Sequence, residues 1–161
     1  MKGFEFFCPT KIICGKHSLD KLPDELEGRG VAHPLVMTDA GLVKLGVAEK
    51  LTRVLDAADV TYDVFDQVPP DSSMDVVNEV AQLYAAKGCD GFVAIGGGSV
   101  IATTKGAAAS LACEGVDFAT LQGSEILKAD LPPLIAVPTT AGTGSEVTLV
   151  AVVADTHKHA K

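Results

Sequence analysis

Short apolar segments alternate along this chain with longer segments whose apolar residues recur at helical spacing. Strands are predicted at 34–38, 60–65, 91–95 and 134–137, helices at 18–27, 47–58, 76–84 and 100–112, and a final β-branched run covers 147–154. Strands that are apolar throughout are typical of parallel sheets with both faces covered by helices. The pattern therefore predicts an α/β fold with a Rossmann-like parallel sheet and helices on both faces.

A short β-hairpin is predicted ahead of this sheet. Two apolar segments, Phe4–Phe7 and Lys11–Cys14, flank Cys8-Pro9-Thr10 and have the composition of strands. The helix predicted over 18–27 contains Pro23, which could break it.

The composition fits one folded domain and excludes several classes of function. Hydrophobic residues make up 47% of the 161 residues and the net charge is −8, with no run rich in lysine or arginine. Such a chain is a poor candidate for nucleic-acid binding. An acid at position 5, and charges and prolines within the apolar stretches, argue against a signal peptide and a membrane span. We therefore expect a cytoplasmic protein.

The cysteines and histidines give no strong sign of a metal site. Cys8, Cys14, Cys89 and Cys113 fit no C-x-x-C pattern, which favours free thiols in a reducing compartment. His17 and His33 have no visible partner in the sequence and are expected at the surface. The last two histidines, His157 and His159, follow Asp155, but we favour a charged terminus over a metal site there.

Three predicted strands end in polar or glycine-rich segments, at Asp39, at Gly96–Ser99 and at Thr139–Ser145. Ligands of parallel sheets bind beyond the carboxyl ends of the strands. The coincidence of these three ends is the main functional clue in the sequence.

The glycine run favours phosphate binding. Glycines let a diphosphate approach the backbone, and the N–H groups that begin the next helix would face the anion. Ser99 could donate a hydroxyl or cap that helix. The alternative is a tight turn that uses glycine for packing, but three consecutive glycines exceed what such a turn needs. The run matches neither G-x-G-x-x-G nor a Walker A loop.

The other two strand ends allow more than one interpretation. Asp39 could bind both hydroxyls of an adenosine ribose or could cap a helix that begins at Ala40. Unlike the ribose-binding acid of an ordinary Rossmann unit, it precedes the glycine run. The segment 139–146 could surround ribose and phosphate oxygens with hydroxyls, or it could be a solvated loop. No nucleophile–base pattern is visible, so the residues alone predict a nucleotide-binding α/β domain without a catalytic centre of its own.

Taken together, these residues resemble the iron-containing alcohol dehydrogenase family over essentially the whole chain. The resemblance rests on Phe6–Pro9 through Gly15, on Thr38-Asp39, on Gly96–Ser99 with Lys105, and on the run Pro138–Thr148. The last run is highly specific to the family, whereas glycerol dehydrogenase and dehydroquinate synthase share the glycine run.

The resemblance implies that residues 1–161 are the N-terminal NAD(P)-binding α/β domain of a metal-dependent alcohol dehydrogenase. In the family a C-terminal helical domain, absent from this chain, binds a divalent metal (Fe or Zn) through one Asp and three His. The full-length enzyme would oxidise a small alcohol or reduce an aldehyde, and we expect it to form a homo-oligomer. The isolated chain would be inactive because it lacks the metal site.

By resemblance, the cofactor-binding residues are spread over the three strand ends, and none is catalytic or metal-ligating. Asp39 would bind the adenosine ribose and favour NAD over NADP. The diphosphate would lie on Gly97, Gly98 and Ser99, and the other contacts would come from Thr139, Thr140, Thr143, Thr148, Val152 and Lys161. The family pattern Ser-x-x-Asp-x-x-Lys is broken here, because Ala102 stands in place of the acid.

A second hypothesis belongs to a different class. The chain could be a stand-alone nucleotide-binding or self-associating interaction module without catalysis, because apolar surface left uncovered by a partner domain favours association.

Overall fold

A computed structural model describes residues 3, 8–121, 123, 127 and 129–154. At its centre lies a sheet of four parallel strands in the order β2-β1-β3-β4. The strands are β1 (Pro34–Met37), β2 (Asp63–Phe65), β3 (Gly91–Gly96) and β4 (Leu134–Pro138). The predicted parallel α/β fold is confirmed.

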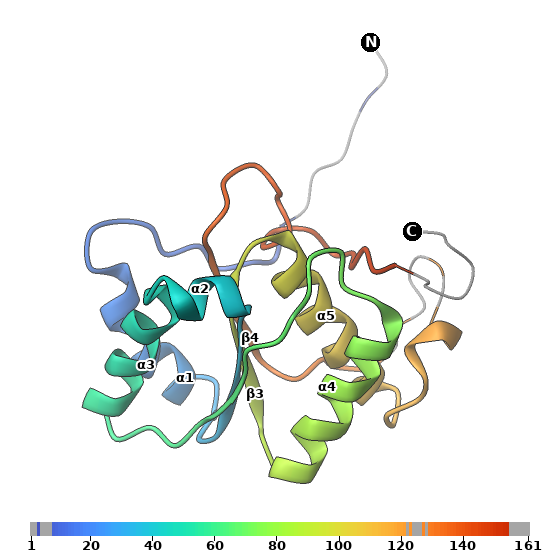
Figure 1. Ribbon diagram of the computed structural model, residues 1–161, viewed down its shortest axis with the longest axis horizontal. Coiled ribbons are helices and arrows are strands. Elements are labelled where there is room, and N and C mark those ends of the chain that lie inside the picture. Colours follow the sequence, from blue (N-terminus) through green and yellow to red (C-terminus); the bar gives the residue numbers. More distant parts are fainter. Residues whose placement is uncertain (1–2, 4–7, 122, 124–126, 128, 155–161) are drawn as a thin grey trace.

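Helices cover both faces of the sheet (Figure 1). One face carries α1 (Leu22–Glu27), α2 (Ala40–Lys44) and α3 (Val47–Ala57), and the other carries α4 (Met74–Lys87) and α5 (Gly98–Ala112). Two short 3-10 helices, η1 (Ser18–Lys21) and η2 (Phe118–Thr120), complete the described elements. Pro23 does not break the first helical segment, because it lies in the first turn of α1, where its missing N–H costs no hydrogen bond.

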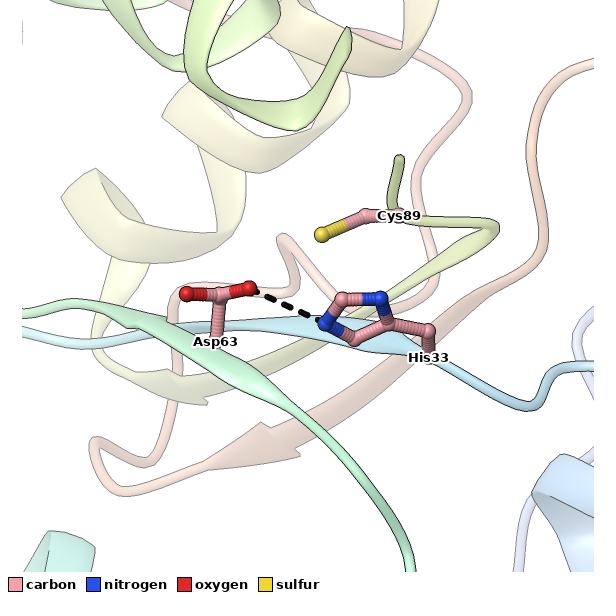
Figure 2. Close-up of side chains that lie close together, drawn as sticks. All are labelled: His33, Asp63 and Cys89. Atoms are coloured by element: carbon pink, nitrogen blue, oxygen red, sulfur yellow. Dashed lines mark hydrogen bonds and ion pairs between the residues drawn. The ribbon is translucent and has the colours of Figure 1, made fainter. Parts of the chain in front are cut away.

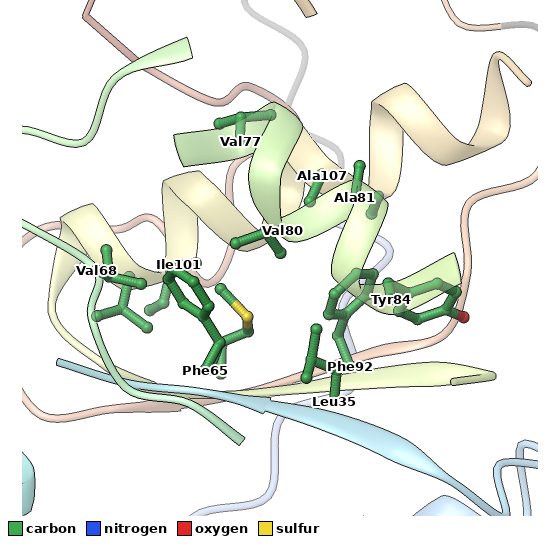
Figure 3. Close-up of a cluster of buried hydrophobic side chains, with 14 of the residues drawn as sticks. Leu35, Phe65, Val68, Val77, Val80, Ala81, Tyr84, Phe92, Ile101 and Ala107 are labelled. Atoms are coloured by element: carbon green, nitrogen blue, oxygen red, sulfur yellow. The ribbon is translucent and has the colours of Figure 1, made fainter. Parts of the chain in front are cut away.

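Each face of the sheet has its own hydrophobic core. Alternate residues of β3 serve the two cores: Phe92 and Ala94 pack under α4 and α5, while Val93 and Ile95 pack under α1 and α3. Figure 3 shows the larger core, in which Leu35 and Phe92 of the sheet meet Val80 of α4. Every residue of β3 is buried, as expected for a strand with helices on both sides.

Helix α4 illustrates how local sequence signals set an element's ends. Ser73 caps its start, with its side chain accepting a hydrogen bond from the backbone N–H of Val76. Gly88 ends it in the left-handed conformation at φ 66°. The predicted apolar stripe is confirmed: Val77, Val80 and Tyr84 are buried.

The described half of the predicted N-terminal hairpin is not a strand. Residues 11–14 are irregular and the side chain of Ile12 is 69% exposed. Lys11 instead forms an ion pair with Glu25 of α1. A strand needs a neighbouring backbone for its N–H and C=O groups, and no described strand pairs with 11–14. The other half, 4–7, lies outside the described residues.

The β-branched run 147–154 does not form a strand either; only Ala154 makes an isolated bridge, to Ser73. The ammonium of Lys105 in α5 donates hydrogen bonds to the carbonyls of Thr148 and Val150. In a β-ladder these carbonyls would accept hydrogen bonds from the backbone N–H groups of a neighbouring strand. Here they accept them from the side chain of Lys105. None of the helices in the described ranges has the length and apolar character needed to span a bilayer.

Candidate functional site

The connections of the sheet diverge between β1 and β3. From β1 the chain proceeds to β2 on one side, and from β3 it proceeds to β4 on the other. In open α/β sheets, the carboxyl ends of two such strands bound the crevice in which ligands bind. Asp39 follows β1 and Gly97 follows β3, so two of the predicted site segments lie at this crevice.

The three glycines differ in what their surroundings require. A Cβ at Gly96 would lie 2.5 Å from the Cβ of Val100, so packing alone excludes any side chain there. A Cβ at Gly97 would instead meet a hydroxyl, that of Thr140, at 3.0 Å, and one at Gly98 would meet the hydroxyl of Ser145 at 3.4 Å. Packing requires glycine at position 96, whereas at Gly97 and Gly98 it is the polar loop after β4 that approaches the backbone.

The hydroxyl-rich loop 139–146 covers the start of α5. Its first residue is held by a hydrogen bond of 3.0 Å from the backbone N–H of Thr139 to the carbonyl of Gly96. The side chain of Thr143 lies over Gly98, and its hydroxyl accepts a hydrogen bond from the backbone N–H of Ser145 at 3.3 Å. The loop thus turns its hydroxyls toward the glycine run and the first N–H groups of α5, which have no partner within the helix.

Asp39 caps helix α2. Its Oδ1 accepts a hydrogen bond from the backbone N–H of Leu42 at 3.0 Å, which is the capping interpretation of the sequence. The carboxylate also lies close to Gly41, where a Cβ would be 2.9 Å from Oδ1. Capping uses one of two carboxylate oxygens, so it fixes the side chain at the crevice without using its full hydrogen-bonding capacity.

Ser99 does not cap α5, because it lies within the first turn of that helix. Its hydroxyl accepts a hydrogen bond of 3.3 Å from the backbone N–H of Asp71, and so connects α5 to the turn after β2. Two further hydroxyls near this edge escaped sequence reasoning. Those of Thr38 and Ser72 are buried and have no hydrogen-bond partner in the structure. Buried polar atoms are nearly always satisfied, so each of these hydroxyls is expected to bond a buried water molecule.

Lys105 organises the outer side of the site. Besides the two carbonyls, its ammonium donates to the hydroxyl of Thr148 at 3.1 Å. Burial lowers the pKa of Lys105, and the charge of Glu146 opposes that shift. One carboxylate oxygen of Glu146 is buried without a hydrogen-bond partner. The sequence contained both residues within the motifs, but nothing in their spacing placed them together.

Of the last two predicted residues, only Val152 is among the described residues. The side chain of Val152 is 64% exposed, on the segment whose last described residue, Ala154, forms the bridge to Ser73. Lys161 lies outside the described residues. Ala102 is buried in the second turn of α5, with no polar group to contribute.

The described residues do not provide the family's metal-ligand set of one Asp and three His. Among them, the only group of three or more close donor side chains is His33, Asp63 and Cys89, at the opposite edge of the sheet. His33 is therefore not the unpartnered surface residue that the sequence suggested; its ring bonds Asp63. The described cysteines are free thiols, as predicted. His157 and His159 lie outside the described residues.

Comparison with known proteins gives a family match over most of the chain. The family model described as iron-containing alcohol dehydrogenase matches residues 9–161. The chain spans about 40% of the length of the curated relatives it matches. Choline dehydrogenase of Bacillus subtilis is 37% identical over 162 residues, which cover 99% of this chain and 40% of that protein.

Solved structures agree in fold. An alcohol dehydrogenase from Oenococcus oeni has a TM-score of 0.89 and 34% identity, covering 98% of this chain and 41% of its own. A sulfoacetaldehyde reductase from Bifidobacterium kashiwanohense, solved in complex with NAD+, has a TM-score of 0.83 and 31% identity, covering 100% of this chain and 42% of its own.

Proposed function

The chain belongs to the iron-containing alcohol dehydrogenase family, and from this premise we propose that it is the NAD-binding domain of a metal-dependent alcohol dehydrogenase. The observation that carries the proposal is the convergence of the glycine run, the hydroxyl loop 139–146 and Asp39 on one crevice. In this proposal residues 1–161 are the N-terminal cofactor domain, and the helical domain that binds the metal lies in the part of the family's length that this chain does not span.

The described residues fit a dinucleotide. The diphosphate would lie at Gly97, Gly98 and Ser99, where the first N–H groups and the dipole of the 15-residue helix α5 favour an anion. The backbone N–H groups would bind the diphosphate without basic side chains, which is compatible with the chain's net charge of −8. The hydroxyl loop supports a polar ligand here, because it brings the side chains of Thr140, Thr143 and Ser145 to the start of α5.

The remaining contacts follow the loop outward. We propose that Thr139, Thr140, Thr143 and Thr148 line the adenine and ribose side of the cofactor, and that Val152 and Lys161 line the nicotinamide side. Lys105 would hold Thr148 in place through its hydroxyl and carbonyl. With no acid at position 102, that turn of α5 offers no carboxylate to the nicotinamide end.

Chemically, the chain's task would be to hold the cofactor for hydride transfer. The nicotinamide ring supplies the hydride acceptor when the cofactor is bound. The chain's own residues bind the diphosphate, orient the ribose and close the loop 139–146 over both. The described residues lack the set of one Asp and three His that binds the family's metal, so that metal would be held by residues outside them. A small alcohol or aldehyde as substrate, and assembly into a homo-oligomer, are further parts of this proposal.

Asp39 provides the first test, because it can be changed without losing the helix cap. Asp39→Asn keeps a capping oxygen but removes the charge that would repel a 2′-phosphate. We expect calorimetric titration to show NAD binding and weaker NADP binding by the native chain, and loss of that preference in the variant. Equal affinities for the two cofactors in the native chain would contradict the assignment of Asp39.

Activity of the chain alone is a second test. We expect the purified 161-residue chain to bind NAD without reducing it in the presence of primary alcohols and added Fe²⁺ or Zn²⁺, because the metal-ligand set is missing from its described residues. Metal-dependent formation of NADH by this chain would show that the division into a cofactor domain and a metal domain is wrong.

The second candidate function is an interaction module without catalysis, and one observation favours it. Leu149, Val150 and Val152 are 75%, 59% and 64% exposed and form an apolar segment on the surface. Such a segment suits a partner domain or a second copy. The NAD titration separates the two functions, since a module that only self-associates would not bind NAD.

A further inference from the structure

Three side chains with metal-binding atoms meet at the amino-terminal edge of the sheet, away from the glycine run. His33 directly precedes β1, Asp63 begins β2 and Cys89 lies two residues before β3. Because the three strands are parallel and adjacent, their amino ends meet at this edge. Figure 2 shows the imidazole, the carboxylate and the thiol pointing toward one another.

The strand register explains why these side chains share one face. Asp63 pairs with Leu35, and His33 lies two positions before Leu35, so the period of two puts both on the face covered by α4. Cys89 belongs to the hydrophobic core on that same face. Residues far apart in the sequence are thus brought together by the pairing of β1 with β2 and β3.

We propose that His33, Asp63 and Cys89 form a binding site for Zn²⁺, with a water molecule as the fourth ligand. Imidazole nitrogen, carboxylate oxygen and thiolate sulfur are the three donor types that zinc takes in proteins, and three protein ligands plus water is the arrangement of open zinc sites. The thiolate and imidazole together favour zinc over Mg²⁺ and Ca²⁺, which prefer oxygen ligands.

The distances allow such a site after small side-chain rotations. The three donor atoms all lie within 4.8 Å of one another. Zinc bonds of about 2.0–2.3 Å separate tetrahedral ligands by roughly 3.3–3.8 Å. Nε2 of His33 and Oδ2 of Asp63, now 2.9 Å apart, must therefore separate by roughly 0.4 Å, whereas a donor pair as far apart as 4.8 Å must close in by about 1 Å. The side chains of His33 and Asp63 are each 26% exposed, which leaves them room to rotate and leaves the site open to solvent for the water ligand.

Neighbouring groups hold the ligands in place. Asp90 accepts hydrogen bonds from the backbone N–H groups of Ala32 and His33, at 2.9 and 2.8 Å, and so fixes the chain that carries the imidazole. Lys87 bonds Oδ1 of Asp63 at 2.9 Å and leaves Oδ2 toward His33. Asp63 can therefore bind zinc through Oδ2 and keep Lys87 as an outer partner of its second oxygen.

The carboxylate of Asp63 is ready to bind zinc, whereas the thiol of Cys89 must first lose its proton. The hydrogen bonds from Lys87 and His33 lower the pKa of Asp63, so this ligand is already ionised at neutral pH. Burial, with Asp63 and Asp90 adding to it, raises the pKa of Cys89 to about 11, so the free thiol is protonated. Zinc binding would break the S–H bond, form the S–Zn bond and release that proton to solvent. The imidazole would bind zinc through Nε2 in the tautomer that carries its proton on Nδ1, so its present hydrogen bond to Asp63 would be replaced by the metal.

Cobalt(II) is the probe that tests the site, because thiolate-to-cobalt charge transfer reports a cysteine ligand directly. We expect one equivalent of Co²⁺ to give this absorption band with the metal-free 161-residue chain, and Zn²⁺ to displace it. Cys89→Ser should abolish the band, whereas Cys14→Ser, which removes an exposed thiol outside the cluster, should retain it. Absence of the band in the native chain, or its survival in Cys89→Ser, would overturn the proposal.

His33→Gln keeps the test decisive if Cys89→Ser fails to fold. This variant should keep the charge-transfer band but bind Co²⁺ at least about tenfold more weakly. Thermal unfolding gives an independent readout: Zn²⁺ should raise the Tm of the native chain and of Cys14→Ser by binding the folded state only. An unchanged affinity in His33→Gln would show that the histidine is no ligand and would reject the three-residue site.

Discussion

Replacement of Phe92 by alanine is expected to lower the free energy of unfolding by about 3–5 kcal/mol. Phe92 is fully buried in β3, the strand that pairs with both β1 and β4. Its ring stacks on that of Tyr84 in α4, with the centroids 4.6 Å apart and 25° between the ring planes (Figure 3). Domains have total stabilities of about 5–15 kcal/mol, so this one change removes a large share.

Urea unfolding followed by circular dichroism measures this effect. Leu45→Ala is the matched control, because Leu45 is 76% exposed and its truncation should change stability by no more than about 0.5 kcal/mol. If Phe92→Ala cost no more than Leu45→Ala, the ring would not be a central packing element of the larger core.

Gly97→Ala is expected to weaken NAD binding by about 10- to 150-fold, the loss associated with one hydrogen bond to a charged group. The backbone of Gly97, at φ −82° and ψ −166°, is one that alanine adopts without strain. The added methyl group would lie 3.0 Å from the hydroxyl of Thr140, in the space between the helix start and the loop. The diphosphate would then be kept from the first N–H groups of α5.

Gly91→Ala is the control variant. Gly91 is the first residue of β3, at the end away from Gly97, and its replacement should affect stability instead of NAD affinity. Its Cβ would lie 2.7 Å from the side chain of Val31, so the variant should lose about 1–3 kcal/mol of stability and keep its NAD affinity. Gly97→Ala should keep its stability and lose affinity. Titration of both variants with NAD, together with their unfolding curves, checks the pair; undiminished binding by Gly97→Ala would count against a diphosphate at the glycine run.

Sequence reasoning succeeded where the structure is set by nearby residues. The helix predicted over 76–84 lies within α4, and the turn from β3 into α5 uses Gly96 for packing, which is one of the two interpretations that the sequence allows. Asp39 could be recognised as a strand-end acid, but its hydrogen bond to Leu42 required coordinates. The glycine run likewise predicted an open helix start without showing which glycine serves packing.

Sequence reasoning failed where contacts between residues distant in the sequence determine the local structure. The β-branched run 147–154 has the composition of a strand, yet Lys105 takes two of its carbonyls. The sequence predicts no partner for His33, since Asp63 is brought to it only by the register of β1 against β2. Periodicity describes one segment at a time, and these contacts depend on how segments pair.

The strand order also bears on how fast the chain can fold. Every strand pair in the described sheet is parallel, so none of these pairs can form early as a hairpin: Pro34 must pair with Gly91, and Phe92 with Leu134. Each pairing closes a long loop and loses chain entropy before contacts compensate for it. During synthesis, β1 would leave the ribosome well before β3, its partner on one side. Until β3 is made, the unpaired N–H and C=O groups of β1, flanked by its apolar side chains, are open to pairing with other chains. The chain is therefore most exposed to aggregation between the synthesis of β1 and that of β3.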